Sequence, residues 1–176
     1  MQHDISIDLL HVGDLRRVGE DKAGALAAYE ESVAIARRLA VIDKDNTLWR
    51  RDLSISLERI LDQRTDARDD IGARKVAEEI LSIRQQLATV DPSNRNWQYD
   101  LGNILIKVGD LRRNTGDDAG RRKAYEEALT LVRPLATADP ANTEWARNFS
   151  LILERVGGIR RNEGDCPASA PVRQIW

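Results

Sequence analysis

The sequence has few of the features that would indicate a secreted or membrane-bound protein. It contains one cysteine, Cys166, so no internal disulfide framework can form, and this suits a reducing compartment. Its longest apolar runs cover only a few residues, far short of the roughly 20 needed to span a bilayer. The opening residues, Met1 to Asp4, have neither the basic stretch nor the apolar core of a secretory signal. These absences favour a cytoplasmic location with no membrane contact.

The sequence also lacks a strong charge of either sign and any recognisable catalytic constellation. Its 27 Lys and Arg residues nearly balance 29 Asp and Glu residues, which leaves a net charge of −2 and no overall field that would attract nucleic acid. The two histidines, His3 and His11, have no Cys or carboxylate partners at metal-ligand spacing. Recurring carboxylates stand a whole repeat apart, too far for paired acid–base work. We therefore expect no enzyme activity, no cofactor and no metal.

A 48-residue repeat runs through the chain. Three of its four tryptophans, Trp49, Trp97 and Trp145, stand 48 residues apart. The same step relates further sets of like residues: Asp43, Asp91 and Asp139; Gly24, Gly72 and Gly120; Asp21, Asp69, Asp117 and Asp165; Arg16, Arg64, Arg112 and Arg160. A fixed period of this size is typical of stacked repeat units, each of which buries its apolar face against its neighbours.

Each copy of the repeat predicts a pair of helices. In the third copy, apolar residues from Trp97 to Val108 follow the i, i+3, i+4 spacing of one buried stripe. Gly116 then predicts a helix terminus, and Asp117 an N-cap for the next helix. Pro140 ends that second helix, since proline lacks an amide proton.

The whole pattern predicts seven helices in about three and a half repeat units. The helices are expected over residues 4–18, 22–42, 47–66, 70–90, 95–115, 118–138 and 143–163. Asn46 and Asn142 are expected to cap the helices that carry Trp49 and Trp145, and Pro134 should bend the sixth helix. The repeat domain covers residues 1–165, with units at approximately 1–45, 46–93, 94–141 and 142–165. Residues 166–176, where the period fails, are expected to form a disordered C-terminal tail.

The pattern resembles the tetratricopeptide repeat (TPR), whose signature is W-x2-L-G-x2-Y, then A-x3-F, then Pro. Leu105-x2-Val108-Gly109 matches the first element with Leu in place of Trp, Ala25-x3-Tyr29 matches the second, and Asp139-Pro140 matches the third. The unit exceeds the usual length of roughly 34 residues by about two turns per helix, which looks like the long-unit variety of large bacterial signalling proteins. The resemblance implies an all-α, right-handed α-solenoid of antiparallel helix hairpins.

In TPR arrays the first helix of each unit lines a concave groove that takes a partner peptide. Carried over by position, the groove residues here would be His11, Asp14, Arg17, Arg59, Asp62, Thr65, Lys107, Asp110, Arg113, Arg155 and Arg161. Their basic, acidic, basic order indicates a partner with acidic groups, because Arg binds carboxylates bidentately. Alternatively, charges three residues apart in one helix satisfy one another, as Asp14 with Arg17 and Asp110 with Lys107 and Arg113.

Two other columns of the repeat have competing interpretations. The Arg16, Arg64, Arg112 and Arg160 column could form a basic stripe for phosphate or acidic peptide. We favour a structural role, in which the arginine stems cover apolar surface and the heads pair with acids of the neighbouring helix. The tryptophans are interpreted as packing wedges between units, with base stacking as the weaker alternative.

The leading hypothesis is therefore a protein-interaction scaffold that presents a helical groove to a partner protein or peptide and catalyses nothing. The alternative is a structural or self-associating fragment of a longer TPR array in a multidomain signalling protein. In that case the uncapped ends would stack, since solenoids normally need polar caps. Binding of single-stranded nucleic acid is disfavoured by the acidic balance of the chain.

Overall fold

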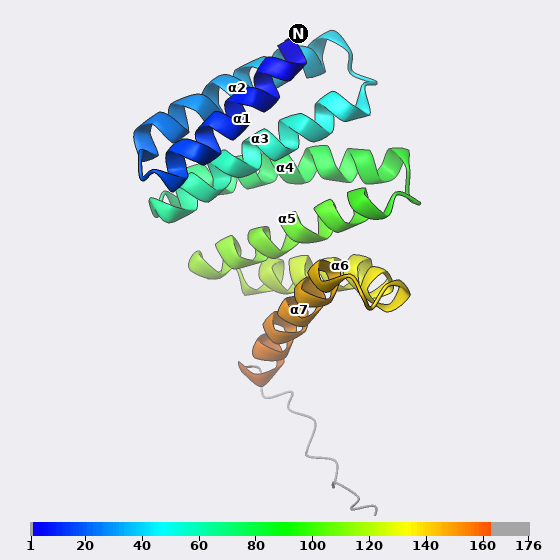
Figure 1. Cartoon of the computed structure of the whole chain (residues 1–176). Coiled ribbons are helices and arrows are strands. Elements are labelled where there is room, and N and C mark those ends of the chain that lie inside the picture. Colours follow the sequence, from blue (N-terminus) through cyan, green and yellow to red (C-terminus); the bar gives the residue numbers. More distant parts are fainter. Residues whose placement is uncertain (1, 163–176) are drawn as a thin grey trace, which may run out of the picture.

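The computed structural model describes residues 2–162, and over these residues the protein consists of seven helices and no strands (Figure 1). They are α1 (Gln2–Val18), α2 (Lys22–Ile42), α3 (Thr47–Asp66), α4 (Asp70–Val90), α5 (Arg95–Asn114), α6 (Asp118–Ala138) and α7 (Thr143–Asn162). Each lies within two residues of its predicted bounds, so the helix predictions are confirmed. The predicted tail at 166–176 lies outside the described residues.

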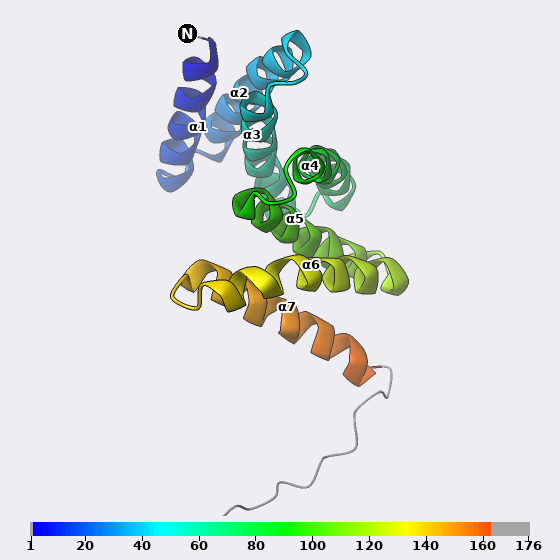
Figure 2. The same cartoon turned by 90° about the vertical axis from the view of Figure 1, so that its right-hand side faces the viewer.

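The helices form a stack of antiparallel hairpins. Each helix packs on the next one along the chain, and contacts between first helices join α1 to α3 and α5 to α7. Figure 1 shows α1, α3 and α5 layered on one side of the stack, with α2 and α4 behind them. In profile the stack bends, so that α1 and the α6–α7 connection project beyond α3 and α5 (Figure 2). The predicted all-α helical repeat solenoid is confirmed.

The repeating polar residues at the hairpin turns cap the helices. Asp21, Asp69 and Asp117 each accept a hydrogen bond of 2.9 Å from the amide of the glycine three residues later. At the other end of each hairpin, asparagine does the same for the tryptophan amides, at 3.1, 3.2 and 3.1 Å from Asn46, Asn94 and Asn142. Both predicted Asn caps are confirmed. Each cap satisfies a backbone donor that the first helical turn leaves free.

The recurring arginines bind these same turns. Arg16 and Arg112 donate to the carbonyl oxygens of Gly24 and Gly120, at 3.1 and 2.9 Å. Arg64 instead donates to the capping carboxylate of Asp69 at 2.5 Å. The predicted pairing with acids thus holds for Arg64 with Asp69 and for Arg112 with Asp117 at 3.6 Å, whereas Arg16 binds a backbone carbonyl oxygen instead. The side chain of Arg160 lies outside the described part. A basic stripe free to bind phosphate does not form at these three positions.

Close packing inside the hairpins depends on two repeat positions that face each other, where a larger residue at one is accompanied by a smaller residue at the other. Gly13 lies against the ring of Tyr29, and Gly109 lies against the ring of Tyr125, where an added Cβ would stand 2.3 Å from a ring carbon in both cases. In the middle hairpin the same two positions are Leu61 and Ala77, both buried. A large residue on one helix is thus matched by a small one on its partner, and the hairpin spacing is preserved.

The three repeated tryptophans differ in how far their side chains are buried. Trp145 is buried and lies against Tyr99 of the preceding unit, with ring centroids 6.3 Å apart. Trp49 and Trp97 are half-buried. The packing interpretation therefore describes Trp145 best, at the junction of α5, α6 and α7. Pro134 lies inside α6, and the helix continues through it to Ala138.

Candidate interaction surface

The predicted groove residues lie on α1, α3, α5 and α7, on a surface that we call the first-helix face. Six of them form a ladder of ion pairs between consecutive first helices. Asp14 pairs with Arg59 at 3.0 Å, Asp62 with Lys107 at 2.6 Å, and Asp110 with Arg155 at 3.0 Å. Each pair joins residues 45 positions apart, so we call this set the 45-step ladder.

This arrangement corrects the predicted pairing within single helices. Sequence reasoning matched Asp14 with Arg17 and Asp110 with Lys107 and Arg113, one turn away in the same helix. In the structure each acid binds a base of the next unit instead. The reason is geometric: the base precedes the acid column by three residues, and adjacent first helices cross so that this earlier turn lies opposite the acid of the preceding unit. The charges satisfy one another, as the alternative interpretation proposed, but across helices.

A second ladder, which sequence reasoning missed, joins the beginnings of the same helices. His3 Nε2 lies 2.6 Å from Asp52 Oδ2, and Arg51 donates to Asp100 at 3.0 Å. One unit further on, the amide of Asn148 donates to the hydroxyl oxygen of Tyr99 at 2.6 Å. These partners are 49 residues apart, so this is the 49-step ladder. The acids at positions 4, 52 and 100 were visible as a column in the sequence, but their partners lie in another helix.

The two ladders have opposite polarity. In the 45-step ladder the earlier helix supplies the acid, whereas in the 49-step ladder it supplies the base or, in Tyr99, the hydroxyl acceptor. Sliding one first helix along the next would break both sets of contacts at once. Their combined effect is to hold the first helices at a fixed register, although each exposed pair is worth only about 0.5 kcal/mol.

The acids of the 45-step ladder have further partners. The Tyr29 hydroxyl donates to Asp14, and the Tyr125 hydroxyl donates to Asp110, both at 2.7 Å. Burial, together with these carboxylates, raises the pKa of both tyrosines, so they remain protonated donors. Asp14 and Asp110 therefore each hold one arginine and one tyrosine, and they have little capacity left for a partner molecule.

The middle of the face contains a buried charged cluster that only the second unit has. Arg84 of α4 is 3% exposed, and it donates to Glu58 at 2.7 Å and to the carbonyl oxygen of Asp100 at 2.9 Å. Glu58 also binds Lys107 at 3.0 Å. Burial alone would raise the pKa of Glu58, but the charges of Arg84 and Lys107 outweigh it and hold this pKa below its usual value. Glu58 is therefore ionised at neutral pH and keeps Arg84 paired.

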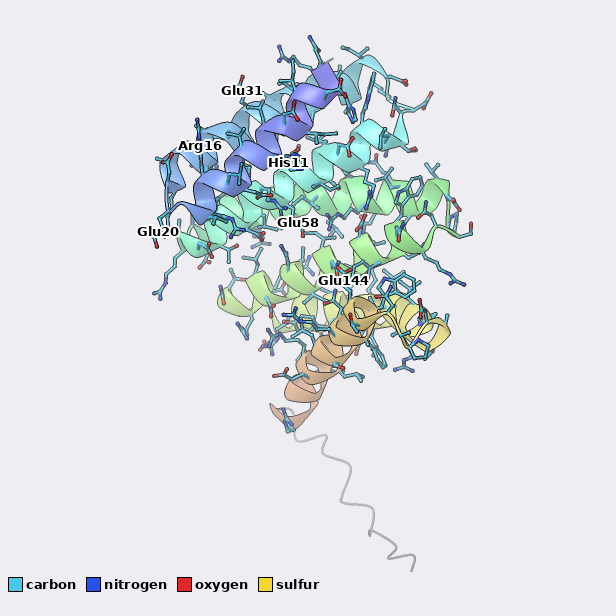
Figure 3. All side chains as sticks on the ribbon, in the orientation of Figure 1. His11, Arg16, Glu20, Glu31, Glu58 and Glu144 are labelled. Carbon is cyan, nitrogen blue, oxygen red and sulfur yellow. The ribbon has the colours of Figure 1, made fainter. Side chains whose placement is uncertain are left out.

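Five predicted groove residues stand outside the ladders. Arg17, Arg113 and Arg161 are exposed at the position one turn beyond the acid column, where the second unit has Thr65. His11 is also exposed, in the column of ladder bases, and no described unit precedes it to supply an acid. Figure 3 labels His11 on α1 and Glu58 on α3, and it shows charged side chains along the whole of this side of the stack.

Two hollows open between first helices near their C-terminal ends. One, of about 290 Å3, lies between α3 and α5, and its polar lining is Asp62, Thr65, Lys107, Asp110, Arg113 and Asn114. The other, of about 260 Å3, lies where α5, α6 and α7 meet. A larger hollow of about 510 Å3 lies between the start of α2 and the end of α3, near the hairpin turns. That one contains none of the predicted groove residues, so we give it no role in binding at the face.

Two further features bear on function. Over residues 2–162, no group of His, Cys, Asp and Glu side chains is placed to hold a metal ion. None of the described helices combines the length and the apolar character that crossing a bilayer requires.

Stacked hairpins of similar length, with first helices in register, make this protein an all-α helical repeat solenoid. No protein-family model matches the chain, and no curated protein matches it. Among solved structures, it is similar to the Sgt2 TPR domain from Aspergillus fumigatus, with a TM-score of 0.43 and 14% identity over 97% of this chain and 90% of that one. It is also similar to a structure titled DHF119 filament, with a TM-score of 0.36 and 12% identity over 96% and 80% of the two chains. A third is the MamA protein, with a TM-score of 0.27 and 13% identity over 95% and 98%. With all three TM-scores below 0.5, the class assignment depends on the chain's own hairpins.

Proposed function

We propose that the chain is a long-unit TPR-like scaffold whose first-helix face binds a segment of a partner protein and catalyses no reaction. The observation that carries this proposal is the division of charge on the face. The 45-step ladder occupies Asp14, Asp62 and Asp110, whereas Arg17, Arg113 and Arg161 remain exposed, and Arg113 and Arg161 lie beside the hollows. The face thus offers one guanidinium group in each of the first, third and fourth units, although the whole chain is slightly acidic.

The exposed arginines favour a partner with acidic groups. A guanidinium presents a planar fork of donors that matches a carboxylate in two parallel hydrogen bonds. The ladders hold successive first helices in register before any partner arrives, which lowers the ordering cost of binding. A partner chain laid along the face would meet one arginine near the end of α1, a second near the end of α5 and a third near the end of α7.

The test must use arginines that do not hold the fold. Arg59 and Lys107 belong to the 45-step ladder, so reversing their charge would disturb the register as well as the surface. Arg17→Ala combined with Arg113→Ala removes only exposed groups. The matched control is Arg38→Ala combined with Arg133→Ala, which removes two exposed arginines from the second helices α2 and α6.

Binding would be measured by fluorescence anisotropy with a set of labelled acidic peptides and their amidated, uncharged counterparts. We expect the double variant Arg17→Ala, Arg113→Ala to bind the tightest-binding acidic peptide roughly tenfold more weakly or worse, a loss of at least about 1.4 kcal/mol of binding free energy. The control double variant should bind as the wild type does. Equal weakening in both would show that general charge, and not this face, attracts the peptides. Equal binding of charged and uncharged peptides would contradict the proposed partner chemistry.

A second candidate function is self-association through α1, and a specific observation favours it. Ile5 and Val12 of α1 are 44% and 38% exposed, whereas the residues at the same positions in α3, Leu53 and Ile60, are 7% and 5% exposed. α1 therefore leaves open a stripe that α3 buries. Light scattering over a wide concentration range tests this: association should appear in the wild type and be reduced by Val12→Glu. A monomer throughout would exclude it.

A further inference from the structure

We propose that the hollow where α5, α6 and α7 meet binds the phosphate group of a phosphorylated serine or threonine on a partner protein. We call it the arginine hollow. Its lining residues are Arg113, Arg121, Tyr125, Glu154, Arg155, Gly158, Ile159 and Arg161. The inference depends on the proposed scaffold function for the source of the phosphate, but not for the existence of an anion site.

The charge of this hollow differs from that of its counterpart one unit earlier. The charged lining of the α3–α5 hollow consists of Asp62, Lys107, Asp110 and Arg113, so two acids cancel two bases. Among the described residues, the lining of the arginine hollow has four arginines and one acid, Glu154. Two of these arginines, Arg155 and Arg121, also pair with Asp110 and Asp118, which lie outside that lining. Two hollows at equivalent places in one solenoid therefore differ: in the first the lining acids balance the bases, whereas in the second Arg113 and Arg161 have no ion pair with a described residue.

Three substitutions between units produce this difference. Relative to the preceding unit, Thr65 is replaced by Arg113, Ala73 by Arg121 and Asp110 by Gly158. Arg121 is the least expected of these, because Ala25 and Ala73 in the same column are fully buried. An arginine at a buried alanine position must send its guanidinium outward, and this one reaches the hollow.

Gly158 leaves space where an acid would close the site. At the same position, Asp62 and Asp110 each bind a base of the next unit. A Cβ added at Gly158 would meet nothing within 4 Å, so the space beside it is open. Arg155 and Arg161 stand one turn to either side of this gap. The fourth unit therefore lacks the acid that the first three units have at this position, but it keeps the bases one turn before and one turn after it.

Arg121 supplies a further hydrogen-bond donor at the arginine hollow. Its side chain is 14% exposed, and one Nη lies 2.8 Å from Asp118. Its Nε is buried and has no hydrogen-bond partner among the described residues, as is also true of the Nε of Arg155 in the same lining and of Arg59 and Arg64 elsewhere. A buried donor without a partner is destabilising, and structures normally satisfy it. An oxyanion in the hollow would accept a hydrogen bond from this nitrogen.

The charge balance favours phosphate over carboxylate. Of the four lining arginines, Arg155 and Arg121 pair with Asp110 and Asp118, whereas Arg113 and Arg161 have no ion pair with a described residue. A phosphate monoester carries nearly two negative charges, which match these two guanidinium groups, and it has three acceptor oxygens. A carboxylate supplies one charge and two oxygens. Three acceptors suit a hollow in which guanidinium groups approach from α5, α6 and α7, since each can bind phosphate through a charge-assisted fork.

The experiment uses the whole chain and three variants at the end of α7. Gly158→Asp restores the acid that the earlier units have. Gly158→Asn adds the same bulk without charge. Ser150→Asp adds the same charge two turns away, at an exposed position outside the lining. Circular dichroism would first establish that all three variants keep the helix content of the wild type.

Calorimetry at physiological salt would compare inorganic phosphate, a short phosphoserine peptide, its unphosphorylated form and a single-stranded oligonucleotide. We expect saturable binding of both phosphate probes, at least tenfold weaker in Gly158→Asp and changed less than threefold in Gly158→Asn and Ser150→Asp. No saturable binding by the wild type, or equal loss in Gly158→Asp and Ser150→Asp, would overturn the site.

The peptide arm separates this inference from the proposed function. Inorganic phosphate binding with the expected variant pattern supports the anion site, even where no peptide binds. The absence of peptide binding would then count against the scaffold function and the protein source of the phosphate. Preference for the oligonucleotide over the phosphoserine peptide would also overturn the protein source. Acidic-peptide binding that survives Gly158→Asp would support the scaffold without this site.

Discussion

An alanine should have opposite effects at Gly109 and Gly157, although both glycines occupy the same column of the repeat. At Gly109 the new Cβ would stand 2.3, 2.7 and 2.9 Å from three carbons of the Tyr125 ring. These separations lie well below ordinary carbon contact distances of about 3.5–4.0 Å. The ring cannot easily move, because Tyr125 is buried and its hydroxyl binds Asp110 at 2.7 Å.

The expected size of the effect follows from two opposing contributions. Overpacking a closed core site costs about 1–3 kcal/mol, and this clash belongs at the upper end. Replacing a mid-helix glycine by alanine returns about 1 kcal/mol through helix propensity. Gly109→Ala should therefore lower the free energy of unfolding by about 2 kcal/mol. At Gly157 the new Cβ meets nothing within 4 Å, so only the propensity gain of about 1 kcal/mol remains.

Urea unfolding followed by circular dichroism and by tryptophan fluorescence would measure both variants. The two variants should differ by about 3 kcal/mol, the sum of the two expected shifts. A Tyr125→Ala background supplies the internal control, since removing the ring should make Gly109→Ala stabilising, as it is at Gly157. Equal stabilities for Gly109→Ala and Gly157→Ala would refute the argument. A Gly109→Ala penalty that persists without the ring would assign the cost to the backbone instead.

Three further predictions concern stability. Glu20 occupies the hairpin-turn position with φ +64°, where Gly116 has φ +73°, so Glu20→Gly should stabilise by about 1 kcal/mol in thermal or urea unfolding. Asn94→Ala should destabilise by about 1 kcal/mol in the same assay, because the cap on the α5 amides is lost. Glu58→Gln should destabilise by about 3 kcal/mol at pH 7, since Arg84 stays buried without its counter-charge. Because the Glu58 pKa is lowered in the fold, the wild-type advantage exists above its ordinary value of 4.5 and is lost as pH falls through the folded pKa. Unfolding at pH 7 and pH 3 checks this, and an equal gap at both would contradict it.

Local features of the structure were predictable because local chemistry sets them. A capping Asp or Asn and the amide it binds are three residues apart, so Asp117 and Asn142 could be identified without any knowledge of the fold. The i, i+3, i+4 pattern of apolar residues likewise depends only on the pitch of a helix. The helix bounds and the repeat period could be read from the sequence for this reason.

The candidate site was predictable in its location but not in its contacts. The column argument placed His11, Asp14, Arg17 and their equivalents on one face, and the structure confirms that they lie on successive first helices. The recurrence of residues every 48 positions could not show which basic side chains form ion pairs and which remain exposed. Arg59 is held by Asp14, whereas Arg17 is exposed, and both are basic residues on first helices.

The sequence by itself determined the helices, their caps and the 48-residue period, because each follows from interactions within a few residues or from simple recurrence. Only the tertiary structure decided that partners lie 45 and 49 residues apart, because those offsets depend on how one helix crosses the next. Only the packing of α5, α6 and α7 brings four arginines together beside Gly158. The replacement of the acid by Gly158 can be read from the sequence, whereas the hollow beside it depends on the packed helices.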